Sequence, residues 1–338
     1  MTGVTSVPLR DTSCHSGLDG LVEVARIVTI GAFDGVHRGH VSLLDRTVAR
    51  ARATGATATA VTFEPLPAQV LNPTRFIGRI CPPAEKVRYI AATGVDEIVS
   101  LAFDQDFSRQ TPDEFLTQLA GKTWLRELWV GEAFALGRNR SGDIPTITKI
   151  GRMLGFTVNT VARLADGDDI VSSSGIRAAI LAGDAATVIR GLGRPFRVTG
   201  PVIHGAHLGR TIGYPTANVA PPPELVPLAD GIYVSEATLP DRAGPRPAMT
   251  YVGTRPTVNS GARLIETHLL DFDDDLYGQI LDVDIWDHLR GDATFEGLDP
   301  LIAQLKADEA QTRAYFHRRG RPETPTTVVR GVYLDPRD

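Results

Sequence analysis

This sequence contains two successive patterns of predicted secondary structure, and they constrain its fold. Over residues 24–186, short runs rich in β-branched residues alternate with segments of helical periodicity. After Gly193-Arg194-Pro195, strand-like runs are separated only by Gly, Pro and Asp turns. The first pattern predicts a parallel sheet with right-handed crossovers, and the second predicts an antiparallel barrel or sandwich. The length of 338 residues also suggests two domains, which we place at residues 1–187 and 188–338.

The expected elements are placed by hydrophobic period and by turn residues. In the first domain we expect strands over residues 26–33, 56–63, 95–101, 125–130 and 156–163. Helices are expected over residues 41–53, 83–92, 112–119, 146–154, 174–181 and 185–192. In the second domain we expect strands over residues 196–202, 231–239, 248–253, 265–271 and 279–286, and a final helix over residues 299–318. The prediction is an α/β domain followed by a small antiparallel β-barrel with a C-terminal helix.

The charge composition argues against a main function in nucleic-acid binding. The chain has 35 basic and 40 acidic residues, whereas proteins that bind a nucleic-acid backbone present a basic surface.

No stretch approaches the ~18 uninterrupted apolar residues of a membrane helix, and the beginning of the chain lacks the apolar core of a signal peptide. Cys14 and Cys81 show no disulfide or CxxC pattern. We expect a cytoplasmic protein with no nucleic-acid or membrane partner, and homo-oligomerisation is left open.

Residues 29–40 (TIGAFDGVHRGH) carry the clearest chemical signal. A predicted buried strand ends in a glycine-containing turn, and a predicted helix follows it. At such a junction in a parallel sheet, free backbone N–H groups point at nucleotide phosphates. Two imidazoles spaced HxGH can donate hydrogen bonds to phosphate oxygens as charge builds up in an in-line displacement. The residues predicted to act here are Gly31, Phe33, Asp34, Gly35, His37 and His40.

A second phosphate-binding site is predicted at residues 171–177 (VSSSGIR). Serines at a helix start cap backbone N–H groups and offer hydroxyls, and an arginine on the first turn can clamp a phosphate. Taken alone, such a serine-rich start is more often only a cap. Together with the histidine motif, it predicts that Ser172, Ser173, Ser174 and Arg177 bind a nucleotide.

The second domain carries a glycine-rich segment at residues 200–218. It is not a P-loop, because the pattern Gly-x4-Gly-Lys-[Ser/Thr] occurs nowhere in the chain. Glycines allow the backbone to approach phosphate, and neutral side-chain oxygens suit a Mg²⁺ ion held largely by phosphates and water. The predicted phosphate-binding residues are Gly209, Gly213 and Pro215, and the predicted metal ligands are Thr216 and Asn218.

Glu266 is predicted to begin a strand in the second domain, ahead of an acidic run at residues 271–275. A carboxylate takes a proton from a hydroxyl only if it lies within hydrogen-bond reach. The acidic run does not form an EF-hand loop, since Leu276 replaces the loop glycine and the closing Glu is missing. We therefore expect the run to be a solvated turn.

These motifs resemble two linked enzyme families. The histidine and serine motifs resemble those of HxGH nucleotidyltransferases, and with TFEPLP at residues 62–67 they resemble bacterial bifunctional riboflavin kinase/FAD synthetases. The GR, IG and PTAN pattern at residues 209–218 resembles the riboflavin kinase signature. The resemblance implies a Rossmann-like domain that adenylylates FMN with ATP, then a kinase domain that phosphorylates riboflavin with ATP and Mg²⁺. Riboflavin, FMN, FAD and ATP would be the small-molecule ligands.

The resemblance also implies roles for particular residues. His37 and His40 would stabilise the reacting phosphates, and Ser173 and Arg177 would hold the phosphates of ATP. Glu266 would be the general base that takes the proton from the 5′-hydroxyl of riboflavin.

Three positions of the first domain depart from the family pattern. Ala133 stands where a polar side chain is usual, Leu136 where an aromatic is usual, and Leu66 where many members carry His. Losing one ligand hydrogen bond typically costs ~0.5–1.5 kcal/mol, so adenylylation could be weaker with the HxGH chemistry unchanged. The main hypothesis is a bifunctional enzyme that makes FMN and FAD. The alternative is a working kinase whose first domain is a transferase retargeted to another flavin or nucleotide, or a weak or regulatory domain.

Overall fold

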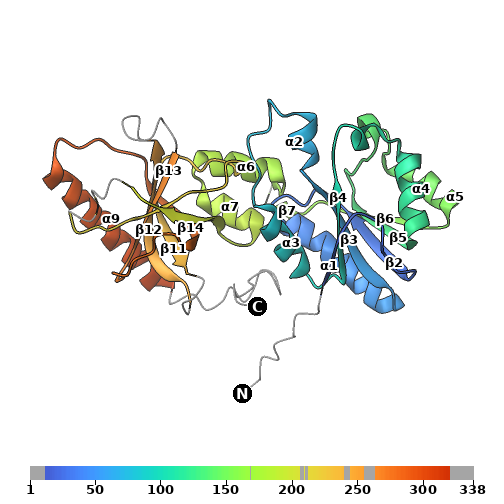
Figure 1. The fold of residues 1–338 in the computed structure, drawn as a ribbon, viewed down its shortest axis with the longest axis horizontal. Coiled ribbons are helices and arrows are strands. Elements are labelled where there is room, and N and C mark those ends of the chain that lie inside the picture. Colours follow the sequence, from blue (N-terminus) through green and yellow to red (C-terminus); the bar gives the residue numbers. More distant parts are fainter. Residues whose placement is uncertain are drawn as a thin grey trace, which may run out of the picture. The chain divides into compact units, whose positions relative to one another are not determined.

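The structure, a computed structural model, describes residues 12–167, 169–205, 209, 212–239, 244–254 and 263–319. These residues form two compact units (Figure 1). The first unit comprises the described residues up to Ile77 together with Pro83–Val171. The second comprises Gly78–Pro82 and the described residues from Ser172 onward. The predicted domain division between residues 187 and 188 stays a prediction.

The first unit is built on a six-stranded sheet in which all neighbouring strands are parallel. In the sheet order β1-β4-β3-β2-β5-β6, the strands are β1 (Ser13–Ser16), β4 (Glu97–Ala102), β3 (Thr57–Glu64), β2 (Ala25–Ile30), β5 (Trp124–Gly131) and β6 (Thr157–Val161). The α-helices are α1 (Arg38–Thr54), α2 (Pro67–Leu71), α3 (Pro83–Ala91), α4 (Pro112–Lys122) and α5 (Ile144–Leu154). The 3-10 helices η1 (Phe107–Arg109) and η2 (Arg138–Arg140) and the small hairpin of β7 (Ala165–Asp166) and β8 (Asp169–Ile170) complete the unit. The predicted parallel α/β fold is confirmed.

Strand β2 lies at the centre of this sheet and carries the topological switch. Five of its six residues are buried, as expected for a parallel strand covered by helices on both faces. Val28 and Ile30 share an apolar core with residues of β5, α4 and α5, and α1 packs against β2 and β3. Because β3 lies on one side of β2 and β5 on the other, the sheet order reverses at β2. Ligands of such sheets bind at the carboxyl ends of the strands beside this reversal, where the loop after β2 begins.

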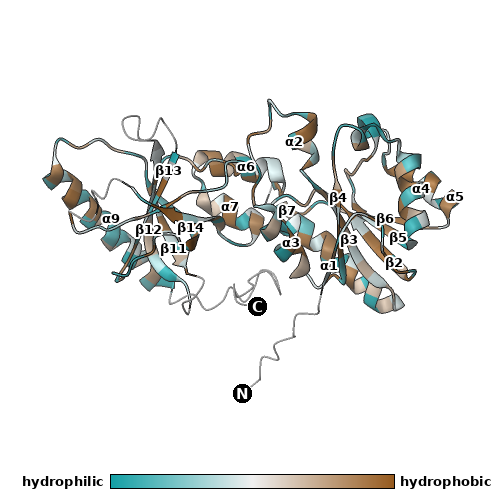
Figure 2. Ribbon diagram, in the orientation of Figure 1, coloured by the Kyte–Doolittle hydropathy of each residue, from teal (hydrophilic) through white to brown (hydrophobic). Residues whose placement is uncertain are grey.

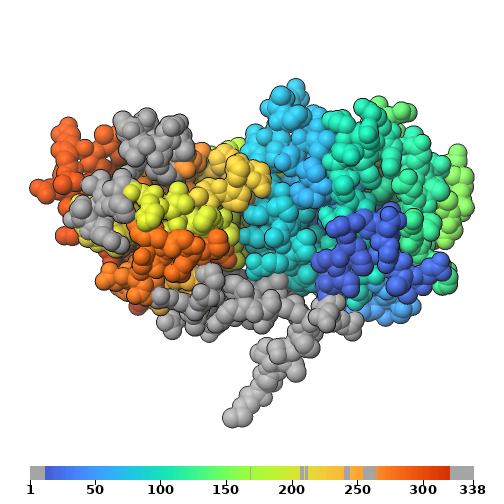
Figure 3. All heavy atoms as spheres, in the orientation of Figure 1, coloured from blue at the N-terminus to red at the C-terminus, as the bar shows by residue number. Residues whose placement is uncertain are grey.

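Several short elements are not predicted by the sequence pattern. Strand β1 (SCHS) has no Val, Ile, Thr or large aromatic residue, and it forms by parallel pairing with β4. It lies at the surface of the first unit, where Figure 3 shows this part of the chain in dark blue. The strand expected over residues 26–33 ends at Ile30, because the chain turns at Gly31.

The second unit opens with α6 (Ser173–Ala182) and α7 (Ala185–Leu192) and continues as a closed antiparallel barrel (Figure 1). In barrel order its strands are β10 (Ala217–Val219), β13 (Arg263–Leu269), β12 (Arg246–Thr254), β11 (Gly231–Thr238), β14 (Ile280–Arg290) and β9 (Phe196–Ile203). Helix α9 (Leu298–Arg319) follows the barrel. The predicted β-barrel with a C-terminal helix is confirmed. The sequence pattern misses β10, whose three residues stand directly after a Gly- and Pro-containing segment.

Helix α9 packs against β11 and β12 and is fixed by polar contacts. Its Asp308 is fully buried and accepts a hydrogen bond from Arg290 Nη2 at 2.8 Å. Near the end of the helix, the Arg319 guanidinium lies 4.2 Å from the centroid of the Trp286 ring. Figure 2 shows both hydrophobic and hydrophilic residues along α9, and the buried residues of this helix are the polar Asp308 and Thr312.

A buried carboxyl group lies next to Trp286. Glu236 on β11 is 2% exposed and pairs in register with Asp284 of β14. Trp286 Nε1 donates a hydrogen bond to Glu236 Oε2 at 2.7 Å. Burial raises the pKa of Glu236 to about 7, and the charge of Asp284 adds to the rise, although the Trp286 hydrogen bond opposes it. Glu236 therefore takes up a proton on folding at mildly acidic pH.

The substitution Glu236→Gln is expected to stabilise the protein more at pH 8 than at pH 5. In the unfolded chain this carboxyl group has its ordinary pKa of 4.5, so the folded state retains a proton that the unfolded state loses as the pH rises toward 7. The wild-type free energy of unfolding therefore falls over that range, by about 3 kcal/mol in total. Thermal unfolding of both proteins at the two pH values measures the difference. The exposed Glu23→Gln is the control, and an equal gain for Glu236→Gln at both pH values would contradict the prediction.

Candidate active sites

The loop that follows β2 has a strained backbone. Phe33 and Val36 adopt positive φ angles of 48° and 37°, and Gly35 has a φ of 74°. Positive φ is uncommon for residues with a side chain, above all for a β-branched one, and such strain clusters at ligand-binding sites. The buried Phe33 ring lies over Gly31, where a Cβ atom would come within 2.9 Å of it. Together with the buried Asp34, these predicted residues form one tight turn at the switch point.

His37 and His40 lie face to face at the start of α1. His37 is the N-cap residue, and its Nδ1 accepts a hydrogen bond from the backbone N–H of His40 at 3.3 Å. The two imidazole rings are stacked, with centroids 3.5 Å apart and planes 18° apart. The HxGH spacing thus brings both imidazoles to the positive end of the helix dipole, where anions such as phosphate are favoured.

His40 is neutral at physiological pH. Burial, and then the neighbouring charge of His37, hold the pKa of His40 well below 6.5. Within the described residues its buried Nδ1 has no hydrogen-bond partner. Because a buried N–H without a partner is rarer than an unpaired acceptor, this favours the tautomer with the proton on Nε2. A neutral imidazole in that form donates one hydrogen bond and adds no charge.

The end of β3 is tied to the histidine loop and to a buried lysine. Thr62 Oγ1 donates a hydrogen bond to the carbonyl of Ala32 at 3.2 Å. Lys86 is 1% exposed, and its Nζ donates to the carbonyl of Phe63 at 2.7 Å and to Glu64 Oε2 at 3.1 Å. The Thr62 bond joins the end of β3 to the loop after β2, and the Lys86 bonds join α3 to the end of β3.

Packing explains two of the three departures from the family pattern. Leu66 is 2% exposed and is therefore a core residue. Leu136 packs against the apolar core of the first unit, and its backbone pairs with Gly142. Ala133 is exposed, and its carbonyl accepts a hydrogen bond from Arg140 Nη2 at 3.3 Å. The apolar side chains at positions 66 and 136 thus contribute to the stability of this unit.

The serine motif opens helix α6, as predicted. Ser172 is the N-cap residue, and its Oγ accepts a hydrogen bond from the backbone N–H of Gly175 at 3.2 Å. Ser173 and Ser174 form the first turn of the helix. Arg177 is the fifth residue of the helix, one turn beyond the first turn on which it is predicted, because the helix begins at Ser173. Its Nε donates to the carbonyl of Gly78 at 2.7 Å. Residues 172–177 of this motif belong to the second unit and the histidine motif to the first, and their joint action on one nucleotide stays a prediction.

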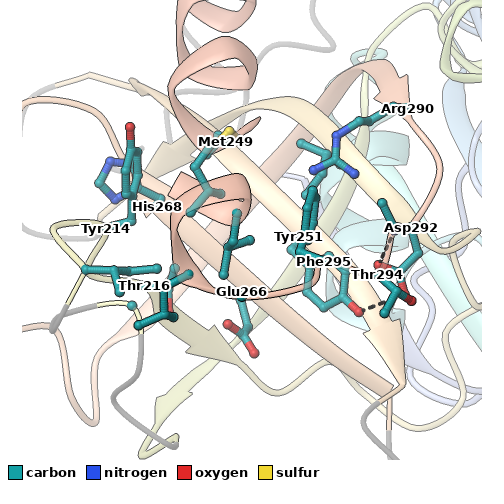
Figure 4. Close-up of a pocket in the computed structure, with 18 residues that line it drawn as sticks. Tyr214, Thr216, Met249, Tyr251, Glu266, His268, Arg290, Asp292, Thr294 and Phe295 are labelled. Atoms are coloured by element: carbon teal, nitrogen blue, oxygen red, sulfur yellow. Dashed lines mark hydrogen bonds between the residues drawn. The ribbon is translucent and has the colours of Figure 1, made fainter. Parts of the chain in front are cut away.

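The barrel unit contains a cavity of about 560 Å³ between the barrel wall and α9 (Figure 4). Its lining is mostly apolar, with a few polar groups, which is typical of a small-molecule site. The lining residues are Gly209, Ile212, Tyr214, Thr216, Ile232, Met249, Tyr251, Glu266, His268, Arg290, Asp292, Ala293, Thr294, Phe295, Gly297, Leu298, Leu301 and Leu305. Three of them, Gly209, Thr216 and Glu266, are predicted from the sequence motifs. The others come from β11, β12, β13 and β14, from the residues before β10, from the loop of residues 292–297 and from α9. The alternation of apolar residues along β11 and β12 indicates only a few of them.

Glu266 lies in the middle of β13, so the prediction that it begins the strand is wrong. The strand extends back to Arg263. Asn218 on β10 stands directly opposite Glu266 in the antiparallel register, and Tyr251 on β12 stands opposite it on the other side. Side chains of such cross-strand pairs lie on the same face, with Cβ atoms roughly 5 Å apart. In Figure 4 the Glu266 carboxylate lies between Thr216 and the aromatic pair of Tyr251 and Phe295.

Four described residues of the glycine-rich segment line this cavity: Gly209, Ile212, Tyr214 and Thr216. The carbonyl of Gly209 accepts hydrogen bonds from the backbone N–H groups of Tyr214 at 2.8 Å and of Ile212 at 3.2 Å. The carbonyl of Pro215 lies 2.8 Å from His268 Nδ1. These contacts hold Thr216 at the cavity wall, directly before β10.

The acidic run after β13 is a turn with exposed carboxylates, as predicted. Asp273, Asp274 and Asp275 are exposed, and Asp271 accepts hydrogen bonds from Arg313 at 2.8 Å. In the described part of the chain, no group of three or more His, Cys, Asp or Glu side chains could hold a metal ion. The predicted Mg²⁺ site does not depend on such a group, because its ligands would be the side-chain oxygens of Thr216 and Asn218 together with phosphate.

Comparison with known proteins gives matches to both halves of the chain. The family model of FAD synthetase matches residues 22–175, and that of riboflavin kinase matches residues 192–316. The bifunctional riboflavin kinase/FMN adenylyltransferase of Escherichia coli (strain K12) is 36% identical over 291 residues, which cover 86% of this chain and 92% of that protein. The protein of the same name from Pseudomonas fluorescens is 37% identical, with 85% and 92% covered. A crystal structure described as a macrolide-efflux protein from Streptococcus pneumoniae is 30% identical, with a TM-score of 0.80, and the match covers 89% of this chain and 98% of that one.

The matches to FAD synthetase over the first half and to riboflavin kinase over the second identify the chain as a transferase with two catalytic domains. The chain belongs to the family of bifunctional riboflavin kinase/FMN adenylyltransferases. Its two halves follow the order of that family, FAD synthetase first and riboflavin kinase second. Among the described residues, no helix has both the length and the apolar character that a membrane span requires.

Proposed function

We propose that this chain makes FMN from riboflavin in its barrel unit and FAD from FMN with its histidine motif, with ATP as the second substrate of both reactions. It would act in the cytoplasm on these small molecules, with no nucleic-acid or membrane partner. The observation that carries the proposal is Glu266 on the wall of the apolar cavity, opposite Asn218. Adenylylation of FMN needs no comparable carboxylate, because its nucleophile, the phosphate of FMN, is already ionised.

In the kinase reaction, the Glu266 carboxylate takes the proton of the riboflavin 5′-hydroxyl as its oxygen attacks the γ-phosphorus of ATP. The bond from that phosphorus to the bridging oxygen breaks, and ADP leaves. The apolar side chains of Ile232, Met249 and Leu305 in the cavity lining are suited to the flat flavin ring. A flavin held there beside bound ATP makes the attack effectively unimolecular.

Thr216 and Asn218 are the proposed ligands of Mg²⁺, together with the phosphates of ATP. A hydroxyl at the cavity wall, and an amide beside the Glu266 carboxylate, are hard oxygen donors of the kind that this ion prefers. When bound, the ion would neutralise charge on the β- and γ-phosphates. The backbone near these phosphates would be provided by Gly209, Gly213 and Pro215.

In the adenylylation reaction, a phosphate oxygen of FMN attacks the α-phosphorus of ATP, and pyrophosphate leaves. The stacked His37 and His40 donate hydrogen bonds to the phosphate oxygens as their charge increases. Because His40 is neutral, its contribution comes from the orientation of its N–H group. The tight turn of Gly31, Phe33, Asp34 and Gly35 presents backbone N–H groups to the nucleotide. The other proposed nucleotide-binding residues are Ser172, Ser173, Ser174 and Arg177.

A one-pot flavin assay tests the whole proposal. The protein is incubated with riboflavin, Mg²⁺ and ATP, and the flavins are separated by chromatography. We expect FMN first and FAD later. FMN without FAD would contradict the adenylylation half, and parallel reactions with CTP or GTP would then show whether the first unit uses another nucleotide. Absence of FMN would contradict the kinase half.

A further inference from the structure

A short segment from the first half of the sequence packs within the second unit. We call residues Gly78–Pro82 the strap; they lie between α2 and α3. The backbone N–H of Arg79 donates to the carbonyl of Glu224 at 2.8 Å, and the backbone N–H of Val226 donates to the carbonyl of Arg79 at 2.9 Å. The strap thus forms a short parallel bridge with the segment before β11.

The strap is clamped tightly against this segment. Arg79, Ile80 and Cys81 are 2%, 2% and 3% exposed, and Val226 is 1% exposed. Gly78 has a φ of +124°, and a Cβ atom there would lie 2.6 Å from the backbone N and Cα of Val226. Any side chain at position 78 would therefore push the strap away from Val226.

The strap also holds Arg177. The carbonyl of Gly78 accepts a hydrogen bond from Arg177 Nε at 2.7 Å. Helix α6, which carries Arg177, is joined to the same unit by the backbone hydrogen bond from Ala229 N–H to the carbonyl of Ile180 at 3.2 Å. A guanidinium is planar, so fixing its Nε together with the helix sets the direction of the whole group.

We propose that the strap positions Arg177 for the phosphates of ATP during FMN adenylylation, with Gly78 as the positioning residue. The inference rests on the proposed function of Arg177. Displacing a clamping group by about 1 Å can cost a large factor in rate even when the change lies away from the chemistry. The close approach of Gly78 to Val226 thus fixes the position of the carbonyl that accepts the Arg177 hydrogen bond.

A double-mutant cycle tests this positioning role. The variants are Gly78→Ala, Arg177→Lys and their combination, and the readout is kcat/KM for ATP with FMN supplied. We expect Gly78→Ala to lower kcat/KM about tenfold in the wild-type background and to have almost no further effect when Arg177 is already Lys. The rate of riboflavin phosphorylation should not change. Gly155→Ala is the matched control, because Gly155 also has a positive φ but nothing lies within 4 Å of its Cβ position.

The outcomes separate this inference from the proposed function. Additive losses, or a wild-type adenylylation rate for Gly78→Ala, would overturn the positioning role. A wild-type rate for Arg177→Lys alone would contradict the function proposed for Arg177, and this inference with it. If Gly78→Ala folds poorly, Arg79→Lys replaces it in the cycle. That variant keeps the charge but loses the hydrogen bond that Arg79 Nε donates to the carbonyl of Cys81 at 2.9 Å.

Discussion

Replacing Glu266 by glutamine is expected to abolish FMN formation almost completely. Glutamine has nearly the same shape but cannot accept the proton of the riboflavin hydroxyl. The loss of a positioned general base lowers kcat by roughly 10²–10⁴-fold. Because the variant keeps the size and polarity of the side chain at the cavity wall, the KM for riboflavin should change little. Steady-state kinetics of riboflavin phosphorylation, with FMN measured by chromatography, test this directly.

The same protein preparation supplies the internal control for Glu266→Gln. Adenylylation of supplied FMN should proceed at the wild-type rate, because Glu266 lies in the barrel and the histidine motif lies in the other unit. Asp273→Asn is the matched control variant, since Asp273 is an exposed carboxylate just beyond the same strand. Loss of both activities in Glu266→Gln would contradict independent sites, and loss of neither would exclude Glu266 as the base.

Replacing His40 by alanine is expected to lower the adenylylation rate by roughly 10²–10³-fold. The imidazole is stacked on His37 at the start of α1, where it can donate to a phosphate oxygen that becomes more negative in the transition state. The effect should appear in kcat, because the hydrogen bond is strongest when the charge has developed. Measurement of FAD formation from supplied FMN and ATP tests this, and riboflavin phosphorylation should remain at the wild-type rate.

Two further variants separate the chemistry of the histidine motif from its structural role. His37 also caps α1 through its Nδ1, so His37→Ala would remove both an imidazole and a cap. His37→Asn keeps a capping group, and it should lose adenylylation while its thermal unfolding stays close to that of the wild type. His317→Ala is the control, since His317 is exposed on α9. Wild-type adenylylation by both His40→Ala and His37→Asn would rule out a role for the imidazoles in the reaction.

The neutral state of His40 could not be predicted from the HxGH pattern. The spacing places two imidazoles on adjacent turns at a helix start, and this much is local geometry. The low pKa of His40 comes from burial and from the charge of His37, and one of the groups packed against His40 is the Phe33 ring, edge-on with centroids 5.3 Å apart. The protonation state of His40 determines how it can stabilise a phosphate, because a neutral imidazole donates a hydrogen bond without contributing a positive charge.

The kinase site shows the same division between local and distant contacts. Thr216, Asn218 and Glu266 are recognisable from their motifs, but their meeting depends on the pairing of β10 with β13. The residues of α9 that close the cavity, such as Leu301 and Leu305, carry no chemical signature. An apolar residue on a helix indicates only that this face is covered, and several arrangements of the barrel satisfy that pattern.

By itself, the sequence determined the two fold classes, their order along the chain and the residues with reactive side chains. The periodicity of secondary structure and the spacing of motifs are properties of short segments, so they can be recognised without knowledge of the distant contacts. Only the tertiary structure decided which strands face one another, that Glu236 is buried beside Asp284 with a raised pKa, and that Gly78 is clamped against Val226 and holds Arg177. These features arise from contacts between residues far apart in the chain, where packing and loss of water set the chemistry of each group. No local period or motif records such contacts.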